Sequence, residues 1–292
     1  MKPITVDVII PTYNRIDLLP ETLKSVQDQS FSNWHCWIVE DGATQETADV
    51  VKPFLKDRRF TYLPGEHAGF PAAPRNRAIR KGTAEFVAIL DDDDLWLPEK
   101  LERQLDFMKT HPNCVLLGCN AFRWPGTGEW DECPLYFKKG MREWISYKAL
   151  LQQNCMINSS ALIRRAALEQ AGLYNEGLNP PIGEDYELWL RLGALGEVWV
   201  IAEPHMVFRE TARTYYSKLD RSQNYQAAVH IFEAVLRGTG NMPSPLTYPE
   251  NAHLADACGR ERDFYLKGPR FLGRFRHELS KKIETIFRSQ AS

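Results

Sequence analysis

The sequence has 292 residues, of which 43% are hydrophobic and 25% charged, and its formal net charge is -2. This composition is ordinary for a globular protein, and the near-neutral charge excludes the strongly basic character of nucleic-acid-binding proteins. No stretch approaches the roughly 20 apolar residues that a membrane-spanning helix needs.

The first hundred residues alternate between strand-like and helix-like patterns. Short apolar runs that end in turn residues predict strands, and apolar residues three and four positions apart predict helices. This alternation predicts an α/β protein with a doubly wound, mainly parallel sheet and right-handed crossovers. The predicted strands cover 6–10, 34–39, 60–63 and 86–90, and the predicted helices cover 18–26, 47–55 and 75–81.

Four consecutive carboxylates, Asp91 to Asp94, follow the fourth predicted strand. Adjacent negative charges repel one another, and a divalent cation with oxygen ligands would remove that cost. Ligands of open α/β sheets bind beyond the carboxyl ends of the strands, where these acids would lie. The acidic row therefore predicts a metal site for a phosphate-bearing ligand. The alternative is a solvated acidic turn ahead of the helix that begins near Pro98.

The second half of the chain is less regular. Aromatic residues between 123 and 145 either line a cleft or cover the sheet. From about Lys218 the chain becomes helical, and a glycine- and proline-rich stretch at 238–249 marks a loop or a boundary. We expect a domain at 1–215 and a helical extension at 216–292. Further strands are predicted at 115–119, 159–163 and 198–201, and further helices at 164–171 and 185–195.

The last segment, from residue 267 onward, has apolar side chains along one helical face and mostly basic side chains around it. Such a helix either lies on an anionic membrane surface or packs its apolar stripe on its own domain, and both alternatives stay open.

The cysteines and the first residues bear on the cellular compartment. None of the six cysteines forms a C-x-x-C pair, which argues against a structural zinc site. Met1-Lys2-Pro3 leads directly into a strand-like stretch, unlike a secretory leader. We expect a cytoplasmic protein with reduced thiols, in peripheral contact with the inner face of the membrane if the last helix binds lipid.

Three further polar clusters fall where a ligand site would need them. Pro11-Thr12-Tyr13-Asn14-Arg15 follows the first strand, and Glu40-Asp41-Gly42 follows the second. The third cluster, 183–189, opens a predicted helix with Gly183-Glu184-Asp185. Because parallel strands end at one edge of the sheet, the first two clusters should lie beside the acidic row.

Together these segments resemble the family-2 glycosyltransferases, which have the Rossmann-like GT-A fold. The resemblance implies an inverting transferase that moves a single sugar from a nucleotide-diphosphate sugar, with UDP favoured, to an acceptor hydroxyl. It also implies a nucleotide-binding part at about 1–97 and an acceptor-side part at about 98–215. The matching segments are 8–15, 39–44, 69–76, 90–96 and 183–189, and they fall in the family's order within about 4–210.

The resemblance assigns the nucleotide site residue by residue. Pro11 and Tyr13 would border the base and the ribose, Asp41 would bond to the base, and Arg75 would lie near the nucleotide. Asp92, within the acidic row, belongs to the same site.

The resemblance also assigns the reaction chemistry. Asp91 and Asp93 match the family's Asp-x-Asp motif, in which Asp91 approaches the ribose or the metal and Asp93 holds Mg²⁺ or Mn²⁺. Asp185 matches the catalytic base, which takes the proton of the acceptor hydroxyl. A single base opposite a metal-assisted leaving group implies one displacement with inversion. The alternative for Asp185 is an acid that merely stabilises the start of a helix.

The sequence departs from the family in several places, among them Glu40, Ala43 and Pro74, and one departure bears on the metal. Glu210-Thr211-Ala212-Arg213 stands where many relatives have a histidine, so no third metal ligand is assigned. The Gln-x-x-Arg-Trp motif of polymer synthases is absent, which favours single-sugar transfer. The acceptor is a glycan, a lipid-linked sugar or a small molecule. Two alternative functions are a non-catalytic sugar-nucleotide or glycan-binding module and a nucleotidyltransferase, although 11–15 lacks the glycine- and lysine-rich loop of the latter.

Overall fold

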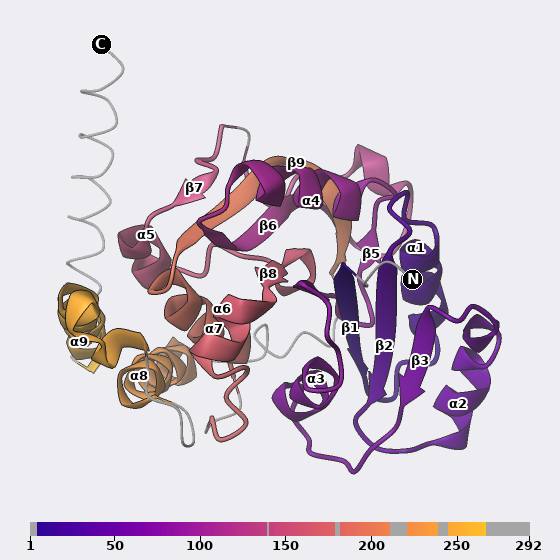
Figure 1. Cartoon of the computed structure of the whole chain (residues 1–292), viewed down its shortest axis with the longest axis horizontal. Helices are drawn as coiled ribbons and strands as arrows, with labels where there is room; N and C mark the ends of the chain where they lie inside the picture. The colour runs from indigo at the N-terminus through magenta and orange to yellow at the C-terminus, as the bar shows by residue number, and fades with distance from the viewer. Residues whose placement is uncertain (1–4, 139, 179–181, 211–220, 239–244, 267–292) are drawn as a thin grey trace.

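The computed structural model describes residues 5–138, 140–178, 182–210, 221–238 and 245–266 (Figure 1). Within these residues the strands are β1 (Val6–Thr12), β2 (Trp34–Glu40), β3 (Phe60–Leu63), β4 (Phe86–Ile89), β5 (Leu95–Trp96), β6 (Cys114–Trp124), β7 (Trp144–Ile145), β8 (Leu162–Arg164) and β9 (Glu197–Arg209). The helices are α1 (Leu19–Gln27), α2 (Gln45–Val51), α3 (Ala72–Ile79), α4 (Lys100–Thr110), α5 (Tyr147–Gln152), α6 (Arg165–Ala171), α7 (Glu184–Gly193), α8 (Arg221–Arg237) and α9 (Ala252–Leu266).

The described strands form one mixed sheet in the order β3-β2-β1-β4-β8-β6-β9-β5, with β7 paired to β9. The first four strands of the chain, β1 to β4, are mutually parallel where they pair, and β8 runs antiparallel to both β4 and β6. The predicted α/β class with a mixed, mainly parallel sheet is thereby confirmed. The register pairs Thr12 with Glu40, so β1 and β2 end side by side.

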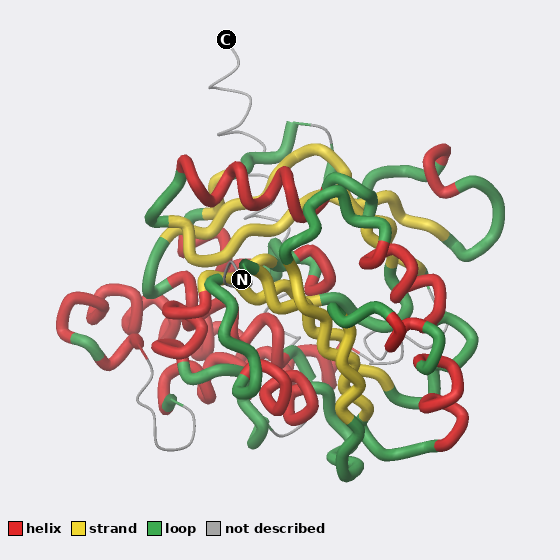
Figure 2. Tube along the Cα trace, turned by 45° about the vertical axis from the view of Figure 1, so that its right-hand side comes forward, coloured by secondary structure: helices red, strands yellow, loops and turns green. Residues whose placement is uncertain are grey.

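Helices cover both faces of the sheet, and Figure 2 shows the strands as a twisted layer with helices on either side. Because successive side chains of a strand point to opposite faces, β1 contributes to two separate cores. Val8 and Ile10 pack with apolar residues of α1 and α4, whereas Ile9 packs with residues of α3, α6 and α7. Every residue of β1 is buried, as expected for a central parallel strand.

The strands β6 and β9 are longer than the predicted 115–119 and 198–201. Their parallel pairing shifts register around Asn120, which pairs with Pro204. Asn120 Nδ2 donates to the carbonyl oxygens of Phe137 (3.0 Å) and Ala202 (3.1 Å), which satisfies backbone groups at the irregularity. A proline is tolerated in a strand at such a bulge, so the pairing continues beyond the residues that appeared to end it.

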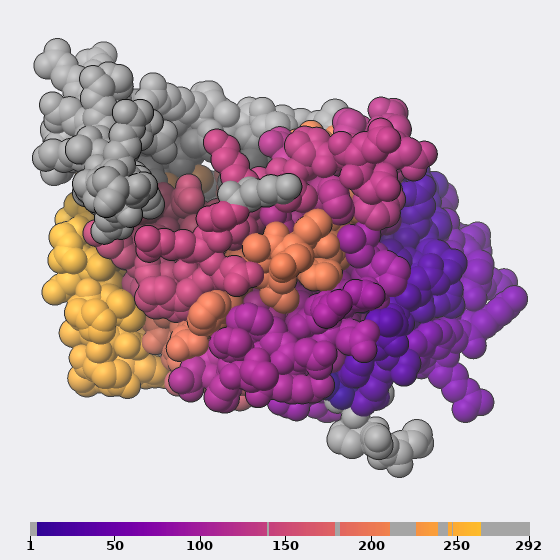
Figure 3. Space-filling model, turned by 90° about the horizontal axis from the view of Figure 1, so that it is seen from above, coloured from indigo at the N-terminus to yellow at the C-terminus, as the bar shows by residue number. Residues whose placement is uncertain are grey.

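The helices α8 and α9 extend one of the two cores rather than forming a separate one. Phe232 of α8 and Cys258 of α9 are buried in the same cluster as Leu188 of α7. Asn251, just before α9, donates to the carbonyl oxygen of Ala194, after α7, at 3.1 Å. In Figure 3, α9 and the first strands lie at opposite ends of the face that is shown. The predicted boundary between 215 and 216 falls outside the described residues and stays a prediction.

None of the helices in the described ranges has the length and apolar character needed to cross a membrane. The predicted basic amphipathic helix beyond residue 267 lies outside the described residues.

A fully buried ion pair anchors α7. The side chains of Glu187 and Arg191 are 0% exposed, and their closest charged atoms lie 2.5 Å apart. Arg191 also donates to the carbonyl oxygens of Ala171 and Leu173 at the end of α6. These bonds compensate the loss of hydration of both charges, so α7 is tied to its neighbour by polar as well as apolar contacts.

Replacing Arg191 with Met should therefore destabilise the protein by about 3–5 kcal/mol, because Glu187 is left as a buried unpaired charge. A double variant that also carries Glu187→Leu should recover much of the loss. Urea unfolding followed by circular dichroism measures both free energies of unfolding. Equal losses in the single and double variants would contradict the assignment.

Candidate functional site

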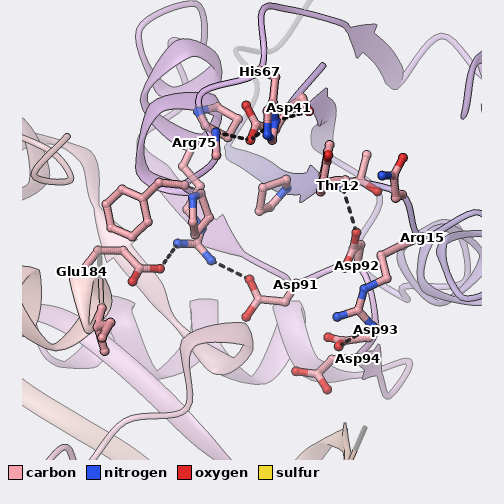
Figure 4. Close-up of a pocket in the computed structure, with 18 of the residues that line it drawn as sticks. Thr12, Arg15, Asp41, His67, Arg75, Asp91, Asp92, Asp93, Asp94 and Glu184 are labelled. Carbon is pink, nitrogen blue, oxygen red and sulfur yellow. Dashed lines mark hydrogen bonds and ion pairs between the residues drawn. The ribbon is translucent and has the colours of Figure 1, made fainter. Parts of the chain in front are cut away.

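A pocket of about 750 Å³ opens beyond the carboxyl ends of β1, β2 and β4. The sheet topology explains its position, because these parallel strands all end at this edge. Seven of the eight predicted site residues line the pocket: Pro11, Tyr13, Asp41, Arg75, Asp91, Asp92 and Asp93. The eighth, Asp185, is not among the lining residues, although its neighbour Glu184 is. Figure 4 shows how several of these side chains converge from separate elements.

Asp41 holds the loop that forms one wall of the pocket. Its carboxylate accepts the backbone N–H groups of Ala68 (2.6 Å) and Gly69 (2.9 Å) and lies 3.1 Å from His67 Nδ1. Asp41 is only 5% exposed, and its own N–H bonds to the Thr12 carbonyl oxygen at 2.9 Å. The residue thus fixes the loop to the ends of β1 and β2, and its predicted bond to a nucleobase stays a prediction.

An aromatic pair stands beside Asp41. The rings of Tyr13 and His67 are stacked, with centroids 4.4 Å apart and planes inclined by 17°. Tyr13 is 49% exposed, which leaves part of its ring open to a ligand. His67 could not be selected from the sequence, because the glycine- and proline-rich loop that carries it has no regular pattern.

Arg75 bridges two elements that are distant in the sequence. From α3, its Nη2 donates to Asp91 Oδ1 and its Nη1 donates to Glu184 Oε1, both at 2.7 Å (Figure 4). The guanidinium also lies over the ring of Tyr174, 5.1 Å from its centroid. Asp91 accepts two further bonds from Asn158 Nδ2, at 2.9 and 3.0 Å. The two oppositely charged partners raise the pKa of Arg75 against the effect of its burial.

The remaining acids of the row have different surroundings. Asp92 is buried against β1, where its carboxylate accepts the Tyr13 N–H at 3.4 Å, and burial raises its pKa to about 7. Asp93 Oδ2 lies 3.1 Å from Arg15 Nη1. Asp94 is buried and accepts the backbone N–H of Arg209 at 2.9 Å, and burial raises its pKa well above the ordinary value. The row is therefore not a solvated turn.

Arg209 was not predicted as a site residue, although it lines the pocket. Its Nε donates to the Asp93 carbonyl oxygen at 2.9 Å, and its Nη2 donates to Glu21 Oε2 at 2.6 Å. Arg15, Arg75 and Arg209 together place three guanidinium groups around four carboxylates. Arg75 was predicted and Arg15 lies within a segment that resembles the family, whereas the only sequence signal for Arg209 was its place just before 210–213.

The donor set suits Mg²⁺ or Mn²⁺ bound together with a ligand. Among the residues that the structure describes, no three His, Cys, Asp or Glu side chains are grouped as a self-sufficient metal site. Mg²⁺ is commonly held by one or two carboxylates and completed by substrate phosphates and water. The two predicted ligands, Asp91 and Asp93, both line the pocket and fit that arrangement.

Asp185 lies in the first turn of α7, next to Glu184. Its Oδ1 accepts the Tyr186 N–H at 2.7 Å, and its Oδ2 accepts from Asn154 Nδ2 at 3.2 Å. Loss of hydration and the charge of Glu184 raise the pKa of Asp185 to about 7. A carboxyl group with this pKa exchanges protons readily near neutral pH.

A family model described as glycosyl transferase family 2 matches residues 7–172, more than half of the chain. The chain belongs to glycosyl transferase family 2. This membership confirms the family that the ordered segments resembled. An uncharacterized glycosyltransferase of Rickettsia bellii is 30% identical over 194 residues, which are 66% of this chain and 27% of that protein. The family-2 chain spans 27–31% of the length of the rickettsial relatives that it matches.

A relative of named activity covers a shorter part of the family-2 chain. The UDP-Glc:alpha-D-GlcNAc-diphosphoundecaprenol beta-1,3-glucosyltransferase WfgD of Escherichia coli is 33% identical over 108 residues, 37% of this chain and 42% of that protein.

Solved structures share the fold. S. aureus TarS 1–349 in complex with UDP-GlcNAc has a TM-score of 0.68 and 19% identity, over 92% of this chain and 74% of that one. Mannosyltransferase PcManGT from Pyrobaculum calidifontis, in complex with GDP-Man and Mn²⁺, has a TM-score of 0.60 and 19% identity, over 97% and 82%. This likeness confirms the predicted GT-A fold of the family-2 chain.

Replacing Asp41 with Ala should loosen the loop at 67–71, because two backbone N–H groups lose a charged acceptor. Bonds to charged groups contribute about 1.5–3 kcal/mol, so exchange of the Ala68 and Gly69 amides should accelerate about 10–100-fold. Hydrogen–deuterium exchange with mass spectrometry measures this, with the amides of α4 as an internal reference. Unchanged exchange would show that Asp41 does not hold the loop.

Proposed function

We propose that this family-2 protein transfers a single sugar, with inversion, from a UDP-linked sugar to an acceptor hydroxyl. The observation that carries the proposal is one pocket that joins the acidic row, the loop at 67–71 (the nucleotide-side loop) and the start of α7. These are the three parts that a displacement at an anomeric carbon requires: a charge stabiliser for the leaving group, a donor site and a base.

Asp91 and Asp93 would hold Mg²⁺ or Mn²⁺ on the leaving-group side of the pocket. When bound, the cation supplies positive charge to the donor diphosphate and stabilises the charge that develops on the departing nucleotide. Arg15 pairs with the Asp93 carboxylate and Arg209 bonds to the Asp93 backbone carbonyl oxygen, so both add positive charge on this side. The Mn²⁺ in the PcManGT structure supports this assignment.

Asp185 is the proposed general base, and the geometry distinguishes it from Glu184. Glu184 is committed to an ion pair with Arg75, so its carboxylate is already engaged within the protein. Asp185 has no such arginine bond among those described; it meets an amide and a backbone N–H, and its pKa is raised to about 7. Adjacent carboxyl groups in different surroundings take different roles, and a carboxyl group with a pKa near the working pH suits proton abstraction.

The nucleotide would occupy the side of the pocket formed by Pro11, Tyr13 and the loop held by Asp41. The half-exposed ring of Tyr13 offers a stacking surface for the base. The TarS complex with UDP-GlcNAc supports UDP as the nucleotide, since that protein shares the fold over most of this chain.

The acceptor is proposed to be a glycan or a lipid-linked sugar. WfgD, a relative over part of the chain, is named for a diphosphoundecaprenol-linked acceptor. Such an acceptor would place the protein in the cytoplasm at the inner face of the membrane, in peripheral contact with lipid.

Replacing Asp185 with Asn should lower kcat by about 10²–10⁴-fold, because general base catalysis contributes an amount of that order. Binding of UDP should remain within a few-fold of wild type, as measured by isothermal titration calorimetry. Radiolabelled transfer and donor hydrolysis, each with Mn²⁺ and with EDTA, measure the rates. Asp106→Asn, an exposed residue of α4, is the matched control.

Retained turnover in Asp185→Asn would remove the residue from its assigned role. Donor binding without any turnover in the wild-type protein would instead favour a non-catalytic sugar-nucleotide or glycan-binding module.

The pH profile should report the same group. A base must be unprotonated, so with a pKa of about 7 for Asp185 the value of kcat should fall about tenfold per pH unit below 7 and level off above it. Initial rates between pH 5 and 9 in constant-ionic-strength buffers test this expectation. Asp92 has a similar pKa, so the Asp92→Asn profile separates the two groups: an acidic limb that is lost in this variant belongs to Asp92.

A further inference from the structure

The structure links the donor side of the pocket to the start of α7 through one buried side chain. Arg75 is 4% exposed, and its two terminal nitrogens each bond at 2.7 Å to a carboxylate, one on either side. Asp91 belongs to the acidic row, whereas Glu184 is the first residue of α7. This leaves both Nη atoms of Arg75 engaged within the protein.

The same arginine belongs to the helix that the pocket loop enters. The loop residues Ala68 and Gly69 are held by Asp41, and α3 begins at Ala72, one turn before Arg75. The loop held by Asp41 therefore leads directly into α3, and Arg75 of α3 bonds to the first turn of α7. A buried guanidinium with two planar bonds fixes the orientation of both partners, because its donors have a rigid geometry.

Besides Glu184, the first turn of α7 is held by Tyr186, whose hydroxyl donates to the carbonyl oxygens of Leu150 (2.6 Å) and Leu151 (3.2 Å) in α5. Gly183, which precedes α7, has a positive φ of 74° and provides no capping side chain. Asp185 accepts from its own neighbour's N–H and from Asn154 at 3.2 Å. Glu187 and Arg191 hold the helix one turn further along. Among the contacts described, the Arg75–Glu184 ion pair is the charged one that links the helix start to Asp91 of the acidic row.

We propose that Glu184 is a positioning residue for the transfer reaction: through Arg75 it fixes the first turn of α7, and with it Asp185, against the acidic row. The inference rests on the proposed function, because it takes Asp185 as the general base. Misplacement of a catalytic group by about 1 Å can cost on the order of 10²-fold in rate.

The charge of Glu184 gives a second, independent readout. It is the negative charge that raises the pKa of Asp185 most, after the loss of hydration, because negative neighbours disfavour ionisation of a carboxyl group. Removing this charge should therefore lower the pKa of Asp185. The other titratable or charged groups that act on Asp185 or respond to its charge are Arg75, Asp91, Tyr136 and Tyr174.

Two variants separate geometry from charge. Glu184→Ala removes the ion pair, so kcat should fall about 100-fold, while the donor KM stays within about threefold. Glu184→Gln keeps an oxygen that accepts from Arg75, so kcat at its optimum pH should stay within about tenfold of wild type. Arg165→Lys is a matched control, because Arg165 makes a comparable buried bridge to Asp7 outside the pocket, at 2.7 Å. It should change the melting temperature without changing the pH profile.

Titration of Asp185 by ¹³C NMR of the labelled aspartate carboxyl groups, assigned with Asp185→Asn, makes the test independent of turnover. The pKa of Asp185 should fall by about one unit in Glu184→Gln. An unchanged titration, or wild-type kcat in Glu184→Ala, would overturn the inference. Loss of activity in Glu184→Gln together with retention in Asp185→Asn would also overturn it, because Glu184 would then be the base. If the wild-type protein transfers no sugar, but the pKa of Asp185 still falls in Glu184→Gln, the proposed function is refuted and the effect of Glu184 on Asp185 stands.

Discussion

Balance of charge at one edge of the sheet is the constraint on which the rest of the site depends. Two of the acids, Asp92 and Asp94, are buried, and like charges in such surroundings repel strongly. Guanidinium groups reduce this repulsion from three directions: the turn after β1, the helix α3 and the end of β9. Three segments that are far apart in the sequence therefore meet at one short acidic turn, where their guanidinium groups offset its negative charge.

The same constraint explains why neighbouring carboxylates have unlike properties. Glu184 and Asp185 are consecutive in a helix, so their side chains diverge by about 100° around its axis. One reaches the buried arginine and the other reaches an amide on a loop near α5. Two neighbouring carboxylates in one helical turn, Glu184 and Asp185, therefore lie in distinct electrostatic environments.

The features of this protein that follow from local sequence patterns were predictable. The features that depend on contacts between residues far apart in the sequence were not. The strands around Val6, Trp34, Phe60 and Phe86 were found because apolar runs and turn residues are properties of the sequence itself. Convergence of the polar clusters followed from the parallel topology. The full length of β6 and β9 was missed, because Asn120 and Pro204 ordinarily end strands and only tertiary pairing shows the bulge. The role of Arg209 was missed for a similar reason: its partners are over a hundred residues away.

The loop anchored by Asp41 has an implication for how the family-2 scaffold diversifies. The Asp41 carboxylate accepts hydrogen bonds from main-chain N–H groups, which every residue except proline possesses. Substitution of the Ala68 side chain therefore leaves the anchor intact, whereas Gly69, with φ of 74°, tolerates little but glycine. Evolution can accordingly vary the chemistry that this segment offers to a substrate while its path stays fixed, so that new specificities arise on an unaltered frame.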